Sequence, residues 1–177
     1  MTRCSCWIWP SLTSQMDGTA LFLGNSTRAS LSNELIASMD SAQPGMNAAQ
    51  QCIVVKAPLE PVYEQWSRIE ELPKFIPPLR QVRRIDDTHF SYTWHSNGQD
   101  QQGVFHIVLQ IPGRRIAWRS MSNNFLSGVV YFEARSERET EVTLKIRSIF
   151  DPRNLSRRVE EYLGNFKRLV EKAGDRA

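Results

Sequence analysis

The feature that most constrains the fold is a run of short alternating segments that ends in one long amphipathic helix. Between residues 155 and 170, apolar side chains recur at helical spacing and form one broad stripe, while charged side chains take the other side. The stripe consists of Leu155, Val159, Tyr162, Leu163, Phe166, Leu169 and Val170, and the charged side of Arg157, Arg158, Glu160, Glu161, Lys167 and Arg168. Such a helix must bury its stripe, so we expect it to lie across the apolar face of a sheet.

The segments before this helix alternate with a period of two, which is typical of strands with one buried face. Phe90, Tyr92 and Trp94 share one phase, and so do Ile116 and Trp118. The same alternation places together Phe105, Ile107, Leu109 and Ile111, then Gly128, Val130 and Phe132, and then Val142, Leu144, Ile146, Ser148 and Phe150. Turn residues separate these segments, so the pattern predicts an antiparallel meander of about six strands.

A further strand and two short helices come before the meander. Cys52 to Lys56 is a β-branched run that reads as a strand. Pro58 and Pro61 then open a helix, because proline is tolerated in a first helical turn, and a second short piece ends near Phe75. The order predicts an α+β fold in which a curved antiparallel sheet of about seven strands wraps around the C-terminal helix.

This arrangement favours a cavity between sheet and helix. A twisted meander curls strongly, and one helix covers only about 10 Å of its width, so the two cannot pack tightly everywhere. The aromatic rings whose phase faces the gap are Tyr92, Trp94, Phe105, Trp118 and Phe132. We expect these rings to line a ligand-sized cavity; the alternative is that they simply fill the gap.

The chain changes character near residue 48. Residues 1–49 are rich in Ser, Thr, Asn and Gly and show little apolar periodicity. We expect them to be a disordered extension, or the translated protein to begin at Met39 or Met46, with the ligand-binding domain in residues 50–177. No stretch approaches the roughly 20 apolar residues that span a bilayer, and the start lacks the pattern of a signal peptide.

The cysteines and the net charge exclude several classes of protein. Cys4, Cys6 and Cys52 make an odd number, which is no disulfide framework and favours a reducing cytoplasm. Cys4-x-Cys6 lacks a second ligand pair, so we expect no metal site. A net charge of +3 is too small to demand a nucleic acid partner. An interaction with nucleic acid or a ribosome stays open if the pairs Arg83-Arg84, Arg114-Arg115 and Arg157-Arg158 merge into one patch.

No catalytic set is evident. His89, His95 and His106 fall out of phase with the apolar face of their strands, so we expect them at the surface. There is no nucleophile elbow and no phosphate loop, and we expect no cofactor. The polar groups in the inward phase are few: Tyr92, Ser120 and Ser148. Tyr92 or Ser148 is a candidate to orient a ligand carbonyl, the alternative being a satisfied core hydroxyl. The pattern indicates no oligomeric state.

Several segments together resemble one family. They are Ile53-Val-Val-Lys-Ala-Pro58, Val62-Tyr63, Trp66, Leu72-Pro-Lys-Phe-Ile76, Pro112-Gly-Arg-Arg-Ile-Ala-Trp-Arg-Ser120, Gly128-Val-Val-Tyr-Phe132, Thr140-Glu-Val-Thr-Leu144 and Phe166-Lys167. Their order and spacing resemble the START-like (SRPBCC) superfamily, in the branch of the polyketide cyclase/dehydrases and coenzyme Q-binding proteins. The resemblance covers about Gln51 to Lys172.

The resemblance implies the helix-grip fold, in which a curved sheet grips a C-terminal helix around a hydrophobic pocket. Members include lipid and quinone carriers, polyketide aromatase/cyclases and a toxin that associates with the ribosome, so the fold alone does not fix the function. We expect a non-catalytic binder of a lipid, quinone or polyketide-like molecule; an aromatase/cyclase or dehydrase, and a macromolecular interaction module, are the alternatives. The expected ligand-binding residues are Phe75, Tyr92, Trp94, Phe105, Ile107, Trp118, Phe132, Ile146, Tyr162 and Phe166.

Overall fold

The computed structural model describes residues 47–121, 126–148 and 153–174. Strand β1 (Asn47–Val55) is followed by helix α2 (Leu59–Ser67) and the 3-10 helix η1 (Ile69–Lys74). The remaining elements are β2 (Leu79–Arg84), β3 (His89–Ser96), β4 (Gln99–Ile111), β5 (Arg115–Ser120), β6 (Leu126–Ser136), β7 (Glu139–Ser148) and α3 (Leu155–Gly174). The first strand thus begins at Asn47 rather than Cys52, and the expectations for residues 1–46 lie outside the described residues.

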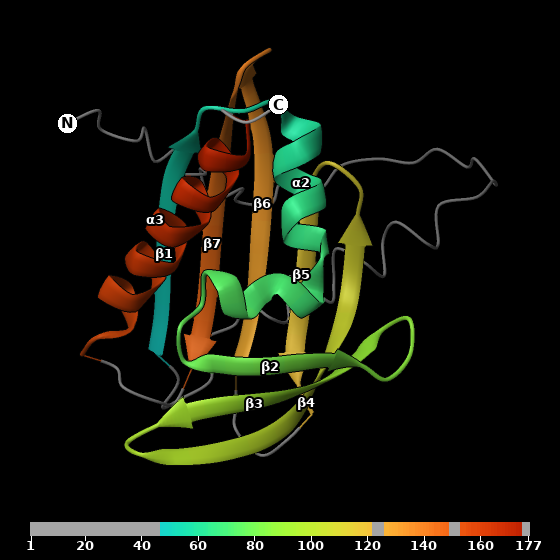
Figure 1. Cartoon of the computed structure of the whole chain (residues 1–177), viewed down its shortest axis with the longest axis vertical. Coiled ribbons are helices and arrows are strands. Elements are labelled where there is room, and N and C mark those ends of the chain that lie inside the picture. Colours follow the sequence, from blue (N-terminus) through green and yellow to red (C-terminus); the bar gives the residue numbers. More distant parts are fainter. Residues whose placement is uncertain (1–46, 122–125, 149–152, 175–177) are drawn as a thin grey trace, which may run out of the picture. The chain divides into compact units, whose positions relative to one another are not determined.

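The seven strands form one antiparallel sheet in the order β1-β7-β6-β5-β4-β3-β2. Strands β2 to β7 follow one another as a meander, and β1 pairs with the last of them along its whole length. Figure 1 shows β2 and β3 running across the direction of β6 and β7, so the sheet curls around the side that carries the described helices. The predicted α+β helix-grip architecture is confirmed.

Strand β4 contains a bulge that the sequence pattern does not reveal. Ile107 pairs with Trp118, but Leu109 pairs with Ala117, so Val108 is an extra residue in β4. An extra residue reverses the alternation beyond it and bends the strand. The prediction that Leu109 and Ile111 share the inner face of Ile107 is therefore wrong: both lie on the outer face.

Helix α3 lies along β1, which is an edge strand of the sheet (Figure 1). Two of its side chains bind backbone groups of that strand's end. Lys167 Nζ donates to the Val54 carbonyl at 2.7 Å, and a Glu171 carboxylate oxygen accepts from the Lys56 amide at 2.8 Å. An exposed strand edge invites pairing with another chain, and these bonds occupy part of it.

An aromatic core joins α2, η1 and α3 beneath the sheet. The Trp66 ring lies 4.7 Å from Phe166 and 5.1 Å from Phe75, and it also contacts Phe132 at 6.2 Å, measured between ring centroids. The Asn165 amide donates to the Phe75 carbonyl at 3.1 Å, which fixes η1 against the helix. The two short helices are thereby held over one end of the curved sheet.

One glycine in the sheet allows a close approach of a tryptophan. Gly128 pairs with Trp118 across β5 and β6, and a Cβ atom at Gly128 would lie only 2.3 Å from Trp118 Cζ2. Real Cβ contacts are never that short, so the indole can lie against this strand only because residue 128 has no side chain.

Replacing Gly128 with Ala tests this contact. We expect the variant to lose about 1–3 kcal/mol of unfolding free energy, because the indole must leave its site. The matched control is Gly164→Ala in α3, where an added Cβ meets nothing within 4 Å. It should be neutral or stabilising by up to about 1 kcal/mol, since alanine has the higher helix propensity. Urea unfolding midpoints measure both, and a Gly128→Ala protein as stable as the wild type would contradict the packing described.

Candidate functional site

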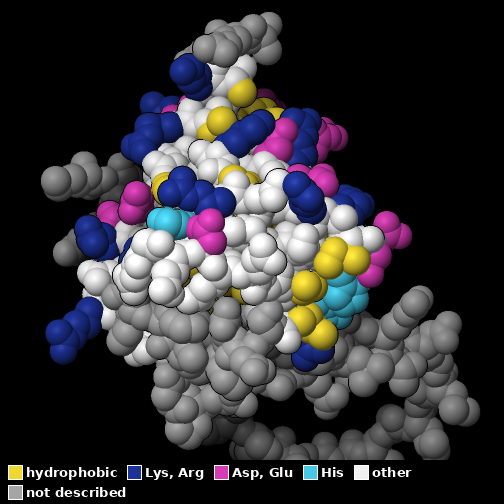
Figure 2. Space-filling view, turned by 60° about the horizontal axis from the view of Figure 1, so that its bottom comes forward, with side chains coloured by type: hydrophobic (Ala, Val, Ile, Leu, Met, Phe, Trp, Pro, Cys, Tyr) yellow, Lys and Arg dark blue, Asp and Glu magenta, His cyan; other side chains and the backbone are white. Residues whose placement is uncertain are grey.

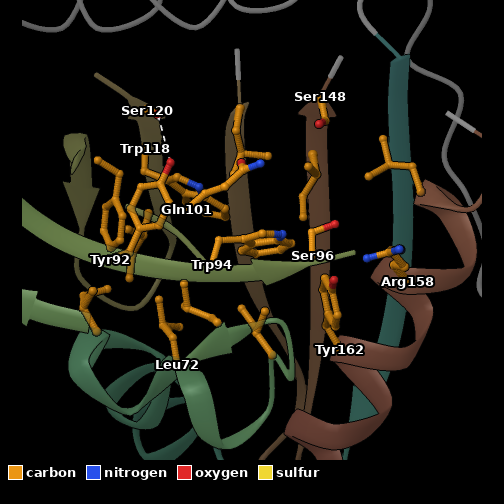
Figure 3. A pocket seen from close by; sticks show the side chains of 18 of the residues that line it. Leu72, Tyr92, Trp94, Ser96, Gln101, Trp118, Ser120, Ser148, Arg158 and Tyr162 are labelled. Atoms are coloured by element: carbon orange, nitrogen blue, oxygen red, sulfur yellow. Dashed lines mark hydrogen bonds between the residues drawn. The ribbon is translucent and has the colours of Figure 1, made fainter. Parts of the chain in front are cut away.

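A cavity of about 750 Å³ lies between the curved sheet and the helices. Its walls come from strands β2 to β7, from α2 and η1, and from the first two turns of α3. The volume lies in the range of roughly 300–1,000 Å³ that is usual for small-molecule sites. Figure 3 shows side chains from β3, β5 and α3 pointing into it from opposite sides.

Seven of the ten residues that the sequence indicated for ligand binding line this cavity. They are Tyr92, Trp94, Phe105, Ile107, Trp118, Ile146 and Tyr162. They come from five different elements and meet because the sheet curls. The inward-facing hydroxyl residues Ser120 and Ser148 line it too.

The other three residues, Phe75, Phe132 and Phe166, lie in the aromatic core with Trp66 instead of on the cavity wall. All three are at most 5% exposed. They face the correct side of the sheet or helix, but neighbouring rings cover them. Of these four rings, Trp66 lines the cavity. The other three pack against Trp66 and so support this part of the cavity wall.

Sequence reasoning missed the wall that the two short helices, the following turn and the start of β2 provide. Besides Trp66, this wall consists of Ile69, Leu72, Ile76 and Leu79. Apolar residues at helical spacing are a visible signal in this segment. The sequence did not show that these helices cover the open end of the sheet, because that depends on tertiary packing.

The position of Arg158 differs from the sequence prediction. The helical pattern assigns Arg158 to the charged, outward side of the last helix, whereas its side chain lines the cavity and is half-buried. The spacing explains this position, because Leu155, Arg158 and Tyr162 stand at i, i+3 and i+7 and so share one helical face. In Figure 3 its side chain extends from α3 toward Ser96 and Tyr162.

The hydroxyls of Tyr92 and Ser120 form a polar pair inside this apolar wall. The Tyr92 hydroxyl lies 3.2 Å from Ser120 Oγ, and either oxygen can donate. Tyr92 is 6% exposed, so the pair is removed from bulk water. Because each hydroxyl can both donate and accept, the pair can bind a ligand carbonyl or hydroxyl.

The described lining residues include no His, Asp, Glu, Cys or Lys. A tyrosine hydroxyl and a serine without a neighbouring base are poor proton acceptors. Within residues 47–121, 126–148 and 153–174, no group of three or more His, Cys, Asp or Glu side chains is placed to hold a metal ion. Cys4 and Cys6 lie outside this part. The described part of the lining therefore offers groups that can bind and orient a molecule.

The histidines lie outside the cavity, as strand alternation predicts. His89 and His106 pair across β3 and β4 and stack with ring centroids 4.5 Å apart. The backbone N–H of Thr88 and the His89 imidazole at 2.9 Å hold the pKa of Asp86 well below its usual range. Burial, together with the neighbouring His89 and Arg119, lowers the pKa of His106.

A curved antiparallel sheet that grips a C-terminal helix around an apolar cavity defines the START-like class of proteins. The chain belongs to the polyketide cyclase/dehydrase and lipid transport family, whose family model matches residues 55–172. Among the described residues, no helix is long and apolar enough to cross a bilayer.

Individual relatives are similar at modest identity. An uncharacterized 17.2 kDa protein from the melC2-rnhH intergenic region of Streptomyces lincolnensis is 28% identical over 124 residues, which cover 70% of this chain and 81% of that protein. A crystal structure from Deinococcus radiodurans is 28% identical with a TM-score of 0.59, covering 69% of this chain and 95% of the other. The Zhui aromatase/cyclase from Streptomyces sp. R1128 has a TM-score of 0.61 at 15% identity, covering 72% and 94%, which is a likeness of fold alone.

The pKa of His106 predicts how stability depends on pH. As the pH falls below about 6.5, the unfolded chain protonates this imidazole before the folded protein does. Stability is therefore full above that pH and is lost as the pH falls through the lowered folded-state pKa. We expect His106→Gln to lose less unfolding free energy than the wild type between pH 7.5 and 5.5 in urea titrations.

The control is His95→Gln, since His95 pairs with Asp100 at the hairpin tip and not with the stacked pair. The unfolding free energy of His95→Gln should fall more steeply with falling pH than that of His106→Gln. Equal slopes for the wild type and His106→Gln would show that His106 is not protonated later in the folded state.

Proposed function

We propose that this protein binds a hydrophobic small molecule, such as a lipid, a quinone or a polyketide-like compound, in the cavity between the sheet and α3, without catalysing a reaction on it. The observation that carries the proposal is a 750 Å³ cavity whose described lining is mostly apolar and contains no acid–base pair. Burial of apolar surface stabilises a bound ligand by about 25 cal/mol per Å² before the costs of association. The proposal includes a cytoplasmic location, which the odd number of cysteines supports.

A bulky substitution on β7 that fills the cavity tests the proposal. Binding is measured with the neutral fluorescent probe N-phenyl-1-naphthylamine. Ile146→Trp places an indole inside the site, and we expect probe affinity to fall at least about tenfold because the ring takes the ligand's volume. The matched control is Lys145→Trp, on the neighbouring residue, which faces outward over Tyr131. It should leave the dissociation constant within about twofold of the wild type.

Probe fluorescence titrations and circular dichroism distinguish the outcomes. A wild-type protein that binds neither this probe nor any quinone or fatty acid would reject the proposal. Undiminished binding by a folded Ile146→Trp protein would place the ligand elsewhere.

A second candidate function is that of an aromatase/cyclase or dehydrase. The Tyr92–Ser120 hydroxyl pair inside the cavity supports it, since two hydroxyls 3.2 Å apart can hold a ketone oxygen while a chain folds. The similarity in fold to the Zhui aromatase/cyclase adds to this support. The absence of a proton acceptor among the described lining residues makes it the second choice.

Reconstitution with a minimal polyketide synthase tests this candidate. If the protein is a cyclase, it should narrow the product mixture to one cyclisation pattern, and the double variant Tyr92→Phe, Ser120→Ala should lose that effect. The variant should still bind N-phenyl-1-naphthylamine, because the apolar wall is intact. A product mixture that the wild-type protein leaves unchanged would reject catalysis of this reaction.

A macromolecular partner has less support. The basic pairs of the sequence lie on β2, before and at the start of β5, and in the first turn of α3. Figure 2 shows basic and acidic side chains interspersed over the described part of one face, rather than a continuous basic surface. If the protein binds nucleic acid or a ribosome, its affinity should fall steeply as the salt concentration rises.

A further inference from the structure

One tryptophan of the cavity wall rests on the backbone of the neighbouring strand. A Cβ atom at Gly128 would lie 2.3 Å from Cζ2 of Trp118 and 2.8 Å from each of the two ring atoms bonded to it, Cε2 and Cη2. Such a point lies above the face of the six-membered ring, because beyond its edge the flanking atoms would recede further. The indole therefore reaches from β5 across to β6 and turns one face toward the backbone of Gly128.

Side chains on both sides keep the indole in this place. Trp118 pairs with Ile107 of β4, and Gly128 pairs with Ile146 of β7, so the four residues form one row across the inner face of the sheet. Ile107 is 8% exposed, so its place in the row is filled. The ring fits over the one residue of the row that has no side chain. A side chain at residue 128 would turn the ring away from the sheet and into the cavity.

The opposite face of this indole is turned toward the cavity. Trp118 lines the cavity and is half-buried, and Figure 3 shows it among the side chains that face this space. Among the described residues, no aromatic ring contacts the Trp118 ring. Trp66, in contrast, contacts Phe75, Phe132 and Phe166 and is 2% exposed. Trp118 thus has one face supported by backbone and one face without an aromatic partner from the described part of the chain.

A ring face in this position favours flat ligands. Aromatic rings stack in an offset arrangement that stabilises the pair beyond the area it buries. A flat ring system has few rotatable bonds and loses little conformational freedom on binding, whereas a flexible acyl chain must be ordered along its length. A saturated ring of the same size is puckered, so it cannot bring all its atoms against the indole.

We infer that Trp118, with Gly128 behind it, is a stacking platform for a flat, unsaturated ring system of the ligand, and that these two residues determine the selectivity of the cavity. The inference rests on the proposed binding function and specifies its ligand class. It favours aromatic and quinone-like rings over fatty acids and other saturated lipids.

A matched pair of ligands tests the inference by isothermal titration calorimetry. The two are 2-naphthol and decahydro-2-naphthol, which share one carbon skeleton and one hydroxyl and differ in flatness. We expect the wild-type protein to bind 2-naphthol about fivefold more tightly. Trp118→Leu removes the flat face and should reduce this preference to less than about twofold. Gly128→Ala displaces the ring and should reduce the preference as well, whereas Gly164→Ala, the matched control in α3, should keep it in full.

A double-mutant cycle measures the contact itself, separately from binding. The alanine at residue 128 should lower the urea midpoint less in the Trp118→Leu background than in the wild type, because no indole is then in its way. An equal loss in both backgrounds would overturn the contact on which the platform depends.

Equal affinities of the wild type for the two ligands would overturn the inference, and this comparison needs no variant. A full preference that survives in a folded Trp118→Leu or Gly128→Ala protein would overturn it too. If the protein binds N-phenyl-1-naphthylamine but shows no preference within the pair, the inference fails and the proposed function stands. If neither the pair nor this probe binds, both fail.

Discussion

Helix α3 buries its apolar stripe beside β1, an edge strand of the sheet, and the rest of the architecture depends on this packing. Side chains of α3 also bond the Val54 carbonyl and the Lys56 amide at the end of β1. A helix about 10 Å wide at the edge of a seven-stranded sheet does not reach the strands at its centre. Strands β3 to β5, beyond the reach of α3, carry much of the cavity wall.

The cavity persists because the side chains around it brace one another. Trp66 contacts Phe75, Phe132 and Phe166, so the aromatic core holds the wall of α2 and η1 at a fixed distance from the sheet. The Trp118 indole lies so close to Gly128 that a side chain there would collide with it. Interiors are normally close-packed, and a void of this size loses dispersion contacts on all its walls. A bound apolar molecule would restore those contacts.

Strand alternation and helical spacing were sufficient to predict the sheet, its meander order and the last helix, because each element has one buried face. They also placed Tyr92, Trp94 and Trp118 on the inner face. Alternation failed beyond Val108, since a bulge leaves no mark in composition. It could not separate Phe132, which other rings cover, from Phe105, which faces the void, because both have the same phase. Arg158 was misplaced because its charge was taken as a sign of exposure, although its spacing assigned it to the apolar face.

The position of the indole rings has an optical consequence. Three tryptophans fall in the described part of the chain, Trp66, Trp94 and Trp118, and all three line the cavity. Any molecule that enters would contact these rings and change their emission. Quinones and conjugated polyketides absorb near the wavelengths at which indole emits, so such ligands would also quench it by energy transfer. These three indoles thus act as built-in reporters of occupancy, and unlabelled candidate ligands can be ranked by the change in intrinsic fluorescence.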